Sequence, residues 1–167
     1  EPNIYHIGII PGVGGKRPNR QWPMEYYVSL INSFDRLKSI KWHLIGGTDE
    51  TKLGRQLVSK LEESQQQSMP NIVNHCGQYT ILETASLLSK LDLVIGGDTG
   101  PLHLDSAVNV KALGLYAPTD TRRTGPLGNQ TSTITPPSEQ ACWPCERPIC
   151  LNAKNKYHTL AWLIFQL

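Results

Sequence analysis

The sequence predicts an α/β protein with a doubly wound parallel sheet covered by helices on both faces. Short apolar segments alternate with longer amphipathic segments along most of the 167 residues. This alternation is the order expected of a parallel sheet. Several apolar segments also end in glycine-bearing turns, which are typical of strand-to-helix connections in such sheets. The length fits one domain with a full hydrophobic core.

The strands are predicted from short apolar runs that contain β-branched residues. In chain order they are Tyr5 to Ile10, Lys41 to Ile45, Ile72 to Cys76, Leu91 to Ile95, Val110 to Tyr116 and a short Ser132 to Thr135. If the spatial order is 3-2-1-4-5-6, the direction of winding reverses between strands one and four. Ligands of such sheets bind at that switch point, beyond the carboxyl ends of the strands.

Helices are predicted where apolar residues recur at helical spacing. The ranges are Met24 to Leu37, a helix from Asp49 and Glu50 to about Gln66, Thr80 to Lys90, a helix opened by Pro101, and Tyr157 to Leu167. The expected core-facing residues are Tyr27, Leu30, Ile31 and Phe34 in the first helix and Leu82, Ala85 and Leu88 in the third.

The stretch from Leu91 to Ala107 predicts an anion site. A strand, a turn of small residues and a helix N-terminus follow one another here, and free N–H groups at a helix start attract anions. Thr99 adds a hydroxyl, and His103 falls in the first helical turn. Asp98 would repel a phosphate, so we expect it to cap N–H groups or to hold a hydroxyl or a cation.

The loop after the first strand contains three glycines and three cations, Lys16, Arg17 and Arg20. Close backbone approach and positive charge suit a phosphate group, although a solvated basic loop would have the same composition. At the switch point this loop would face the turn that follows Ile95. The two loops together predict a diphosphate ligand.

Asp49 and Glu50 follow the second strand, and two interpretations stand side by side. Acids in a first helical turn commonly cap it. A carboxylate at the carboxyl end of a strand can also bind a ribose.

The composition excludes several classes of function. A formal net charge of +2 is too small to favour nucleic acid or a membrane surface. We expect no signal peptide, and the sequence contains no apolar run long enough to span a membrane. The chain begins at Glu1 without a methionine, so we expect a fragment of a longer protein.

The four cysteines do not form the pattern of a secreted disulfide framework, which favours a reducing cytoplasm. Three of them, Cys142, Cys145 and Cys150, have a spacing open to a structural zinc or iron–sulfur site. The fourth ligand would be His158 or Cys76. Free thiols are the preferred interpretation, and no metal is expected at the anion site.

Four blocks of sequence resemble the C-terminal half of the bacterial lipopolysaccharide heptosyltransferases, glycosyltransferase family nine. They are a PG…RQWP segment after the first strand, LIGGTDE, GGDTGPLHLDSA and ALGLYAPTDTRRTGPLG. The resemblance covers roughly residues 5 to 150.

The resemblance implies one half of a GT-B enzyme, which has two Rossmann-like domains. Residues 1–167 would be the C-terminal donor-binding domain, and the N-terminal acceptor domain would be absent. The implied reaction is inverting transfer of heptose from ADP-heptose to the lipopolysaccharide inner core. The catalytic base belongs to the absent domain, so we expect this chain to bind donor without turnover.

The resemblance also implies roles for individual residues. Arg20 occupies the position of a phosphate-binding lysine, and Glu50 best matches a ribose-binding glutamate, with Asp49 as its rival. The residues expected around the departing diphosphate are Arg20, Lys16, Thr99, Gly100, Pro101 and Leu102. Those expected around the nucleotide sugar are Pro11, Gly12, Glu50, Asp98 and His103.

Further expectations follow from the same resemblance. No cofactor is required, although a divalent cation could stimulate transfer. The partners would be an ADP-sugar and the lipid A–core acceptor, with no nucleic acid. A monomer is expected in the cytoplasm, in peripheral contact with the inner membrane. The alternatives are a non-catalytic nucleotide or sugar-phosphate binding module and a GT-B transferase that uses a UDP- or GDP-sugar.

Overall fold

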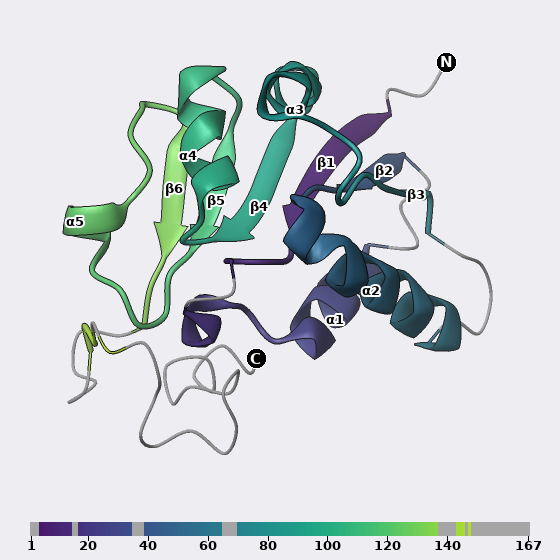
Figure 1. The fold of residues 1–167 in the computed structure, drawn as a ribbon, viewed down its shortest axis with the longest axis horizontal. Helices are drawn as coiled ribbons and strands as arrows, with labels where there is room; N and C mark the ends of the chain where they lie inside the picture. Colours follow the sequence, from purple (N-terminus) through teal and green to yellow (C-terminus); the bar gives the residue numbers. More distant parts are fainter. Residues whose placement is uncertain are drawn as a thin grey trace.

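The computed structural model describes residues 4–14, 17–34, 39–64, 70–136, 143–145 and 147. These residues form a sheet between two layers of helices (Figure 1). The helix predicted at Tyr157 to Leu167 lies outside the described residues.

Six parallel strands form the sheet in the order β3-β2-β1-β4-β5-β6, which confirms the predicted doubly wound fold and is the order that the switch-point argument assumed. The strands are β1 Tyr5–Ile10, β2 Ile40–Leu44, β3 Ile72–Asn74, β4 Leu93–Gly97, β5 Ala112–Leu115 and β6 Thr131–Ile134. Parallel strands buried between helices need apolar side chains on both faces, and this is why their sequence runs are nearly continuous.

The strand β4 begins at Leu93 rather than at the predicted Leu91. The N–H of Leu91 donates to the carbonyl of Leu88 at 3.0 Å, so Leu91 still belongs to the turn that ends the preceding helix. At the other end, Gly96 and Gly97 remain in the strand because they pair with β5.

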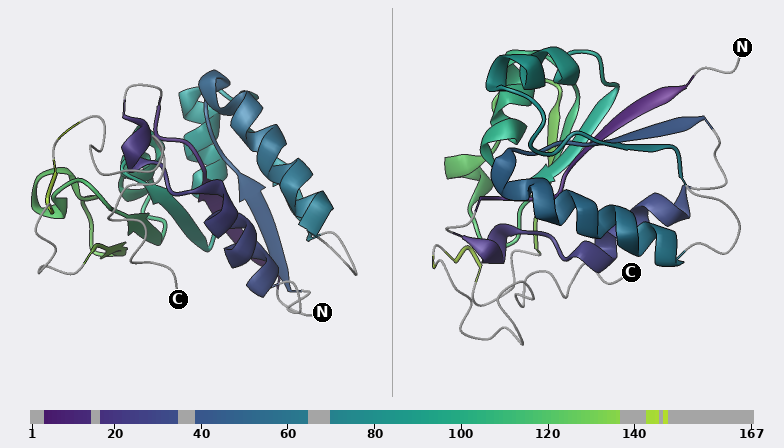
Figure 2. Two further views of the ribbon diagram at one scale, coloured as in Figure 1. Left: turned by 90° about the horizontal axis from the view of Figure 1, so that it is seen from below. Right: turned by 45° about the vertical axis from the view of Figure 1, so that its right-hand side comes forward.

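Two helices cover each face of the sheet, α1 and α2 on one side and α3 and α4 on the other (Figures 1 and 2). Right-handed crossovers place α3 and α4 on the second face, since the chain crosses back over β1 between β3 and β4. The helices are α1 Met24–Ser33, α2 Thr51–Ser64, α3 Ile81–Leu88, α4 Gly100–Ala107 and α5 Thr121–Thr124, with 3-10 turns η1 Pro18–Arg20 and η2 Thr48–Glu50.

The core is divided into two clusters by the sheet. Beneath α1 and α2, Tyr27 and Ile31 pack with Ile9 of β1. On the other face, Leu88 of α3 and Leu102 of α4 pack in a second cluster. Burial on both faces holds the carboxyl ends of β1 and β4 in fixed positions.

Two expected core residues are instead exposed. Leu82 is 79% exposed and Phe34 is 39% exposed. A capping box sets the rotation of α3, because the Glu83 carboxylate accepts from the Thr80 N–H at 2.8 Å while the Thr80 hydroxyl accepts from the Glu83 N–H at 3.4 Å. This start turns Leu82 outward. Phe34 lies just beyond the end of α1, where helical spacing no longer sets its direction.

Within the described ranges, every helix is too short or too polar to span a lipid bilayer.

Candidate functional site

The predicted site lies at the carboxyl ends of β1 and β4, which are neighbours in the sheet. From β1 the chain winds toward β2 and β3, and from β4 it winds toward β5 and β6. The loops that leave these two strands therefore diverge, and a switch point between diverging loops is where a ligand is expected.

The loop after β1 is held in place by aromatic residues of α1. The Tyr27 hydroxyl donates to the carbonyl of Ile10 at 3.2 Å, at the end of β1. Trp22 packs edge-on against Tyr27 with ring centroids 4.8 Å apart. Between these anchors, η1 brings Arg20 to the end of β4.

The two loops face each other, as predicted from the sequence. A Cβ atom at Gly97 would lie 3.0 Å from the carbonyl oxygen of Arg20 and 3.0 Å from the Val13 side chain. A larger residue at position 97 would therefore push the first loop away from β4. Lys16, the other cation expected here, lies outside the described residues.

Asp98 is the centre of the polar contacts in the crevice. Its side chain is 5% exposed, and its Oδ2 lies 2.7 Å from Nη1 of Arg20. The Thr124 hydroxyl donates to the same oxygen at 3.2 Å. His103 Nε2 lies 3.7 Å from Oδ1. The prediction that Asp98 holds a cation or a hydroxyl is confirmed, and it holds both.

The ion pair changes what the crevice can bind. A lone buried carboxylate would repel a phosphate, but a guanidinium at 2.7 Å neutralises it. Asp98 in turn fixes one edge of the Arg20 side chain, which is 16% exposed. Arginine presents several N–H donors in one plane, so a fixed guanidinium is suited to a phosphate.

The N-terminus of α4 offers an anion fewer N–H donors than the sequence predicted. Pro101 has no N–H, and the N–H of Leu102 donates to the carbonyl of Thr99 at 3.1 Å. Thr99 and Gly100 remain as donors, and nothing lies within 4 Å of a Cβ built on Gly100. The Thr99 side chain makes no capping hydrogen bond to the helix. Its hydroxyl is therefore placed at an open helix start.

Glu50 lies at the edge of the same site and also acts as a cap. Its Oε2 accepts from the N–H of Gly47 at 2.9 Å, which confirms the capping interpretation. The side chain also lies against Gly12 in the first loop, where a Cβ would meet the Glu50 Cγ at 2.2 Å. Glu50 is thus beside the buried Pro11–Gly12 segment, whereas Asp49 is exposed. This geometry favours Glu50 over its neighbour as the carboxylate of the site.

The sequence predicted no role for α5, although this helix contributes a contact to Asp98. Asp120 caps this helix and pairs with Arg122, whose Nη2 lies 2.6 Å from Oδ2. These bonds lower the pKa of Asp120 to about 2. Thr124, at the end of α5, contacts Asp98. The P-T-D segment indicated a structured loop, but no pattern in the sequence predicts a contact between residues 98 and 124.

A second buried carboxyl group lies deeper in α4. Asp105 is fully buried, and neither of its side-chain oxygens has a hydrogen-bond partner among the described residues. Burial raises the pKa of Asp105 to about 8, which keeps this group mainly protonated at neutral pH.

The cysteine cluster is only partly within the described residues. Cys145 is described and its thiol is free, while Cys142, Cys150 and His158 lie outside the described residues. Cys76 is buried, and burial raises the pKa of its thiol to about 12. The described ranges contain no group of three or more His, Cys, Asp or Glu side chains that could hold a metal ion.

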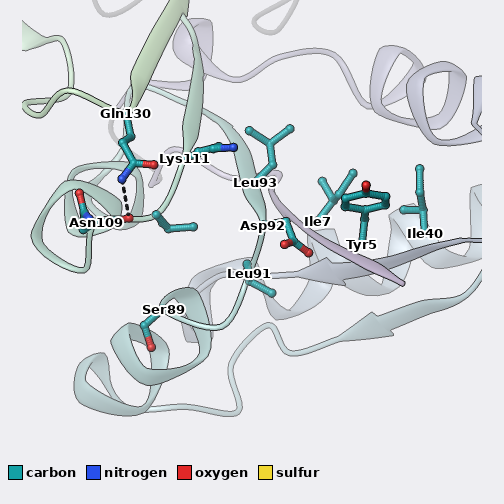
Figure 3. A pocket seen from close by; sticks show the side chains of 11 residues that line it. Tyr5, Ile7, Ile40, Ser89, Leu91, Asp92, Leu93, Asn109, Lys111 and Gln130 are labelled. Carbon is teal, nitrogen blue, oxygen red and sulfur yellow. Dashed lines mark hydrogen bonds between the residues drawn. The ribbon is translucent and has the colours of Figure 1, made fainter. Parts of the chain in front are cut away.

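A hollow of about 590 Å³ lies at the opposite end of the sheet from the predicted site (Figure 3). Its lining includes Tyr5, Ile7 and Leu93, near the amino ends of their strands, together with Asp92 and Lys111. The Asp92 carboxylate accepts a hydrogen bond from the backbone N–H of His6 at 2.7 Å. The hollow is therefore separate from the Arg20–Asp98 pair at the carboxyl ends of the strands.

Curated relatives match most of this chain. It is 24% identical over 144 residues to a lipooligosaccharide heptosyltransferase 2 of Campylobacter jejuni, an alignment that covers 86% of this chain and 43% of the relative. It is 27% identical over 128 residues to the enzyme of that name in Haemophilus influenzae, covering 77% of this chain and 36% of the relative. The chain thus spans less than half the length of these relatives.

Solved structures confirm the fold. The structure of Escherichia coli ADP-heptose lps heptosyltransferase II superposes with a TM-score of 0.69 at 20% identity, over 80% of this chain and 39% of that one. The E. coli heptosyltransferase WaaC with ADP gives a TM-score of 0.66 at 20% identity, over 81% of this chain and 39% of that one.

The family model of glycosyltransferase family 9 (heptosyltransferase) matches residues 5–155, a range that includes the Arg20, Glu50 and Asp98 loops. The chain therefore belongs to glycosyltransferase family 9, the heptosyltransferase family.

Proposed function

We propose that this chain is the donor-binding domain of an inverting heptosyltransferase that uses ADP-heptose and acts on the lipopolysaccharide inner core. The observation that supports this most is the Arg20–Asp98 pair beside the open N-terminus of α4. The two curated relatives carry the name heptosyltransferase, and one solved neighbour is described as an ADP-heptose enzyme.

The chemistry of the transfer requires the departing diphosphate to be stabilised. Negative charge grows on the leaving oxygen as the sugar bond breaks, and fixed donors lower the barrier. Arg20, held by Asp98, would supply positive charge, and Thr99 and Gly100 would supply donors at the start of α4. Because these groups are already fixed by the fold, little reorganisation is needed when the ligand binds.

The remaining residues would orient the nucleotide sugar. Glu50 lies one strand away, at the end of β2, where it could accept from the ribose hydroxyls. His103 is 42% exposed in its side chain and lies beside Asp98. It would contact the sugar or its phosphate.

The chain would bind donor without sustained turnover. An inverting transfer also needs a base on the acceptor hydroxyl, and we assign this base to the part of the relatives that the chain does not span. The acceptor, peripheral contact with the inner face of the inner membrane and the monomeric state belong to the same proposal. A non-catalytic nucleotide-binding module, or a UDP- or GDP-sugar transferase, would use the same crevice.

Calorimetric titration with ADP, UDP and GDP tests the proposal. We expect ADP to bind, with affinity at least tenfold weaker in Arg20→Ala, because a charge-assisted phosphate contact is worth about 1.5 to 3 kcal/mol. Arg55→Ala, the same change on the exposed surface of α2, is the matched control and should bind as the parent does. Tight UDP or GDP binding with weak ADP binding would indicate that the donor is a UDP- or GDP-sugar instead of an ADP-sugar. Equal binding by Arg20→Ala and the parent would refute the site.

A further inference from the structure

The described residues nearest the C-terminus contact two loops at the carboxyl edge of the sheet. The backbone N–H of Cys145 donates to the carbonyl of Pro118 at 2.6 Å, in the loop after β5. The side-chain amide of Asn19, in η1, donates to the carbonyl of Arg147 at 2.8 Å. We call residues 143–145 and 147 the strap, because they join two loops that lie far apart in the sequence.

Asn19 anchors the turn that carries Arg20. Within this turn the N–H of Arg20 donates to the carbonyl of Arg17 at 3.0 Å, and the N–H of Gln21 donates to the carbonyl of Pro18 at 3.1 Å. These two bonds fix the shape of the turn but not its position on the domain. Asn19 is 1% exposed, and its bond to the strap ties the turn to another part of the chain. The position of η1 therefore depends on the strap.

The other end of the strap is connected to Asp98 through α5. Pro118 is buried, and the chain runs from it to Asp120, which caps α5. Thr124, at the other end of this short helix, donates its hydroxyl to Asp98 at 3.2 Å. Asp98 in turn lies 2.7 Å from the guanidinium of Arg20. The strap is thus linked to both partners of the ion pair.

These contacts form a closed circuit around the Arg20–Asp98 pair. It runs from Asn19 to the strap, then to the loop after β5, through α5 to Asp98 and back to Arg20. The Arg20 side chain is therefore held at its tip by Asp98 and at its base by η1. A side chain that is ordered before a ligand arrives loses less conformational entropy on binding, which strengthens the affinity.

We infer that Asn19 is a positioning residue, whose bond to the strap holds Arg20 in place for the diphosphate of the ligand. This inference rests on the proposed function, because it assumes that the diphosphate lies at Arg20. Asn19 acts only through Arg20 and makes no contact of its own with the ligand. Without the bond, Arg20 must be ordered when the ligand binds, and ordering one long side chain typically weakens affinity about twofold to tenfold.

The test is a double-mutant cycle. Calorimetry with ADP and with inorganic pyrophosphate is run on the parent chain, Asn19→Ala, Arg20→Ala and the double variant. Asn19→Ala should weaken both ligands by about fivefold, since both carry the diphosphate. In the Arg20→Ala background the same change should have no further effect, because the effects of coupled residues are not additive. Asn71→Ala, exposed before β3 at the opposite edge of the sheet, is the matched control and should bind as the parent does.

The other attachment of the strap provides a pair of variants that leave η1 unchanged. Cys145→Pro removes the N–H that donates to Pro118, whereas Cys145→Ala keeps this N–H and removes only the thiol. Cys145→Pro should weaken ADP and pyrophosphate as Asn19→Ala does, and Cys145→Ala should bind as the parent does. Equal losses in the two variants would assign the effect to the thiol and overturn the strap. If urea unfolding shows that Asn19→Ala does not fold, this pair decides the inference.

The outcomes separate this inference from the proposed function. If Arg20→Ala weakens ADP and Asn19→Ala does not, the diphosphate site stands and the positioning role is overturned. If Asn19→Ala weakens ADP equally with and without Arg20, it does not act through that residue, which also overturns the inference. If neither ADP nor pyrophosphate binds to the parent chain, both proposals fail.

Discussion

Replacement of Asp105 by asparagine should stabilise the protein in a way that depends on pH. The side chain is fully buried in α4, and neither oxygen has a hydrogen-bond partner within the described ranges. Burial raises the folded-state pKa of Asp105 from 3.8 to about 8. In the unfolded chain the carboxyl group ionises near its ordinary pKa. Folding at neutral pH must therefore take up a proton or bury a charge.

The sign of the effect follows from linkage. A carboxyl group whose pKa is raised in the folded state makes its full contribution to stability only below the pKa that it has in the unfolded state. This contribution is lost as pH rises from the unfolded-state pKa to the folded-state pKa. The loss amounts to about 1.4 kcal/mol for each pH unit. By pH 7 the parent chain has lost about 4 kcal/mol that the asparagine variant retains.

Urea unfolding of the two chains at pH 5, 6, 7 and 8 measures this difference. The buried amide of asparagine adds a penalty of its own, but that penalty does not change with pH, so the slope and not the offset is the test. Asp49→Asn, at an exposed position, is the matched control and should give a difference in unfolding free energy that is nearly flat with pH. A flat difference for Asp105→Asn as well would refute the reasoning.

Three further predictions concern the site and His43. In Gly12→Ala the new Cβ would lie 2.2 Å from the Glu50 Cγ, so the Glu50 side chain must move, at a cost of about 1 to 3 kcal/mol in stability. Calorimetry should also show ADP affinity reduced about tenfold, as for the loss of one hydrogen bond to a charged group. An unchanged affinity would show that Glu50 does not contact the ligand. Asp98→Asn takes the charged partner from Arg20, and because this pair is largely buried we expect the free energy of unfolding in urea to fall by about 3 kcal/mol. A neutral result would show that the pair contributes nothing to the stability of the fold. Burial lowers the pKa of His43 from 6.5 to about 4, so its contribution to stability is retained above pH 6.5 and lost as pH falls toward 4. The melting temperature of His43→Asn should therefore fall less steeply with decreasing pH than that of the parent. Parallel slopes would contradict this role of His43.

Much of the site was predictable because it depends on local chemistry. The glycine turn after β4, Pro101 at the helix start and the cations of the first loop are all features of contiguous sequence, and the alternation of elements predicts where the strands end. The contact between Thr124 and Asp98 could not be predicted, because it joins residues 98 and 124 through the packing of α5. The boundary of β4 was missed for a similar reason, since the turn that ends α3 takes up Leu91.

The histidines show the same limit. His6 and His43 lie in β1 and β2, and His75 directly follows β3. Their spacing in the sequence does not reveal that strand pairing places them in one line, bonded at 3.0 Å. Register is a property of two strands together, and a shift by one residue would turn each ring to the other face of the sheet.

The sequence by itself determined the fold class and the family, because both depend on periodicity, turn residues and short motifs that are local in the chain. Tertiary structure alone decided which charges meet and which are buried. It paired Arg20 with Asp98, brought Glu50 against Gly12, left Asp105 without a partner and aligned three histidines beneath Tyr79. The physical reason is that electrostatic and stacking energies depend on distance and burial, and these are set only when the helices pack on the sheet.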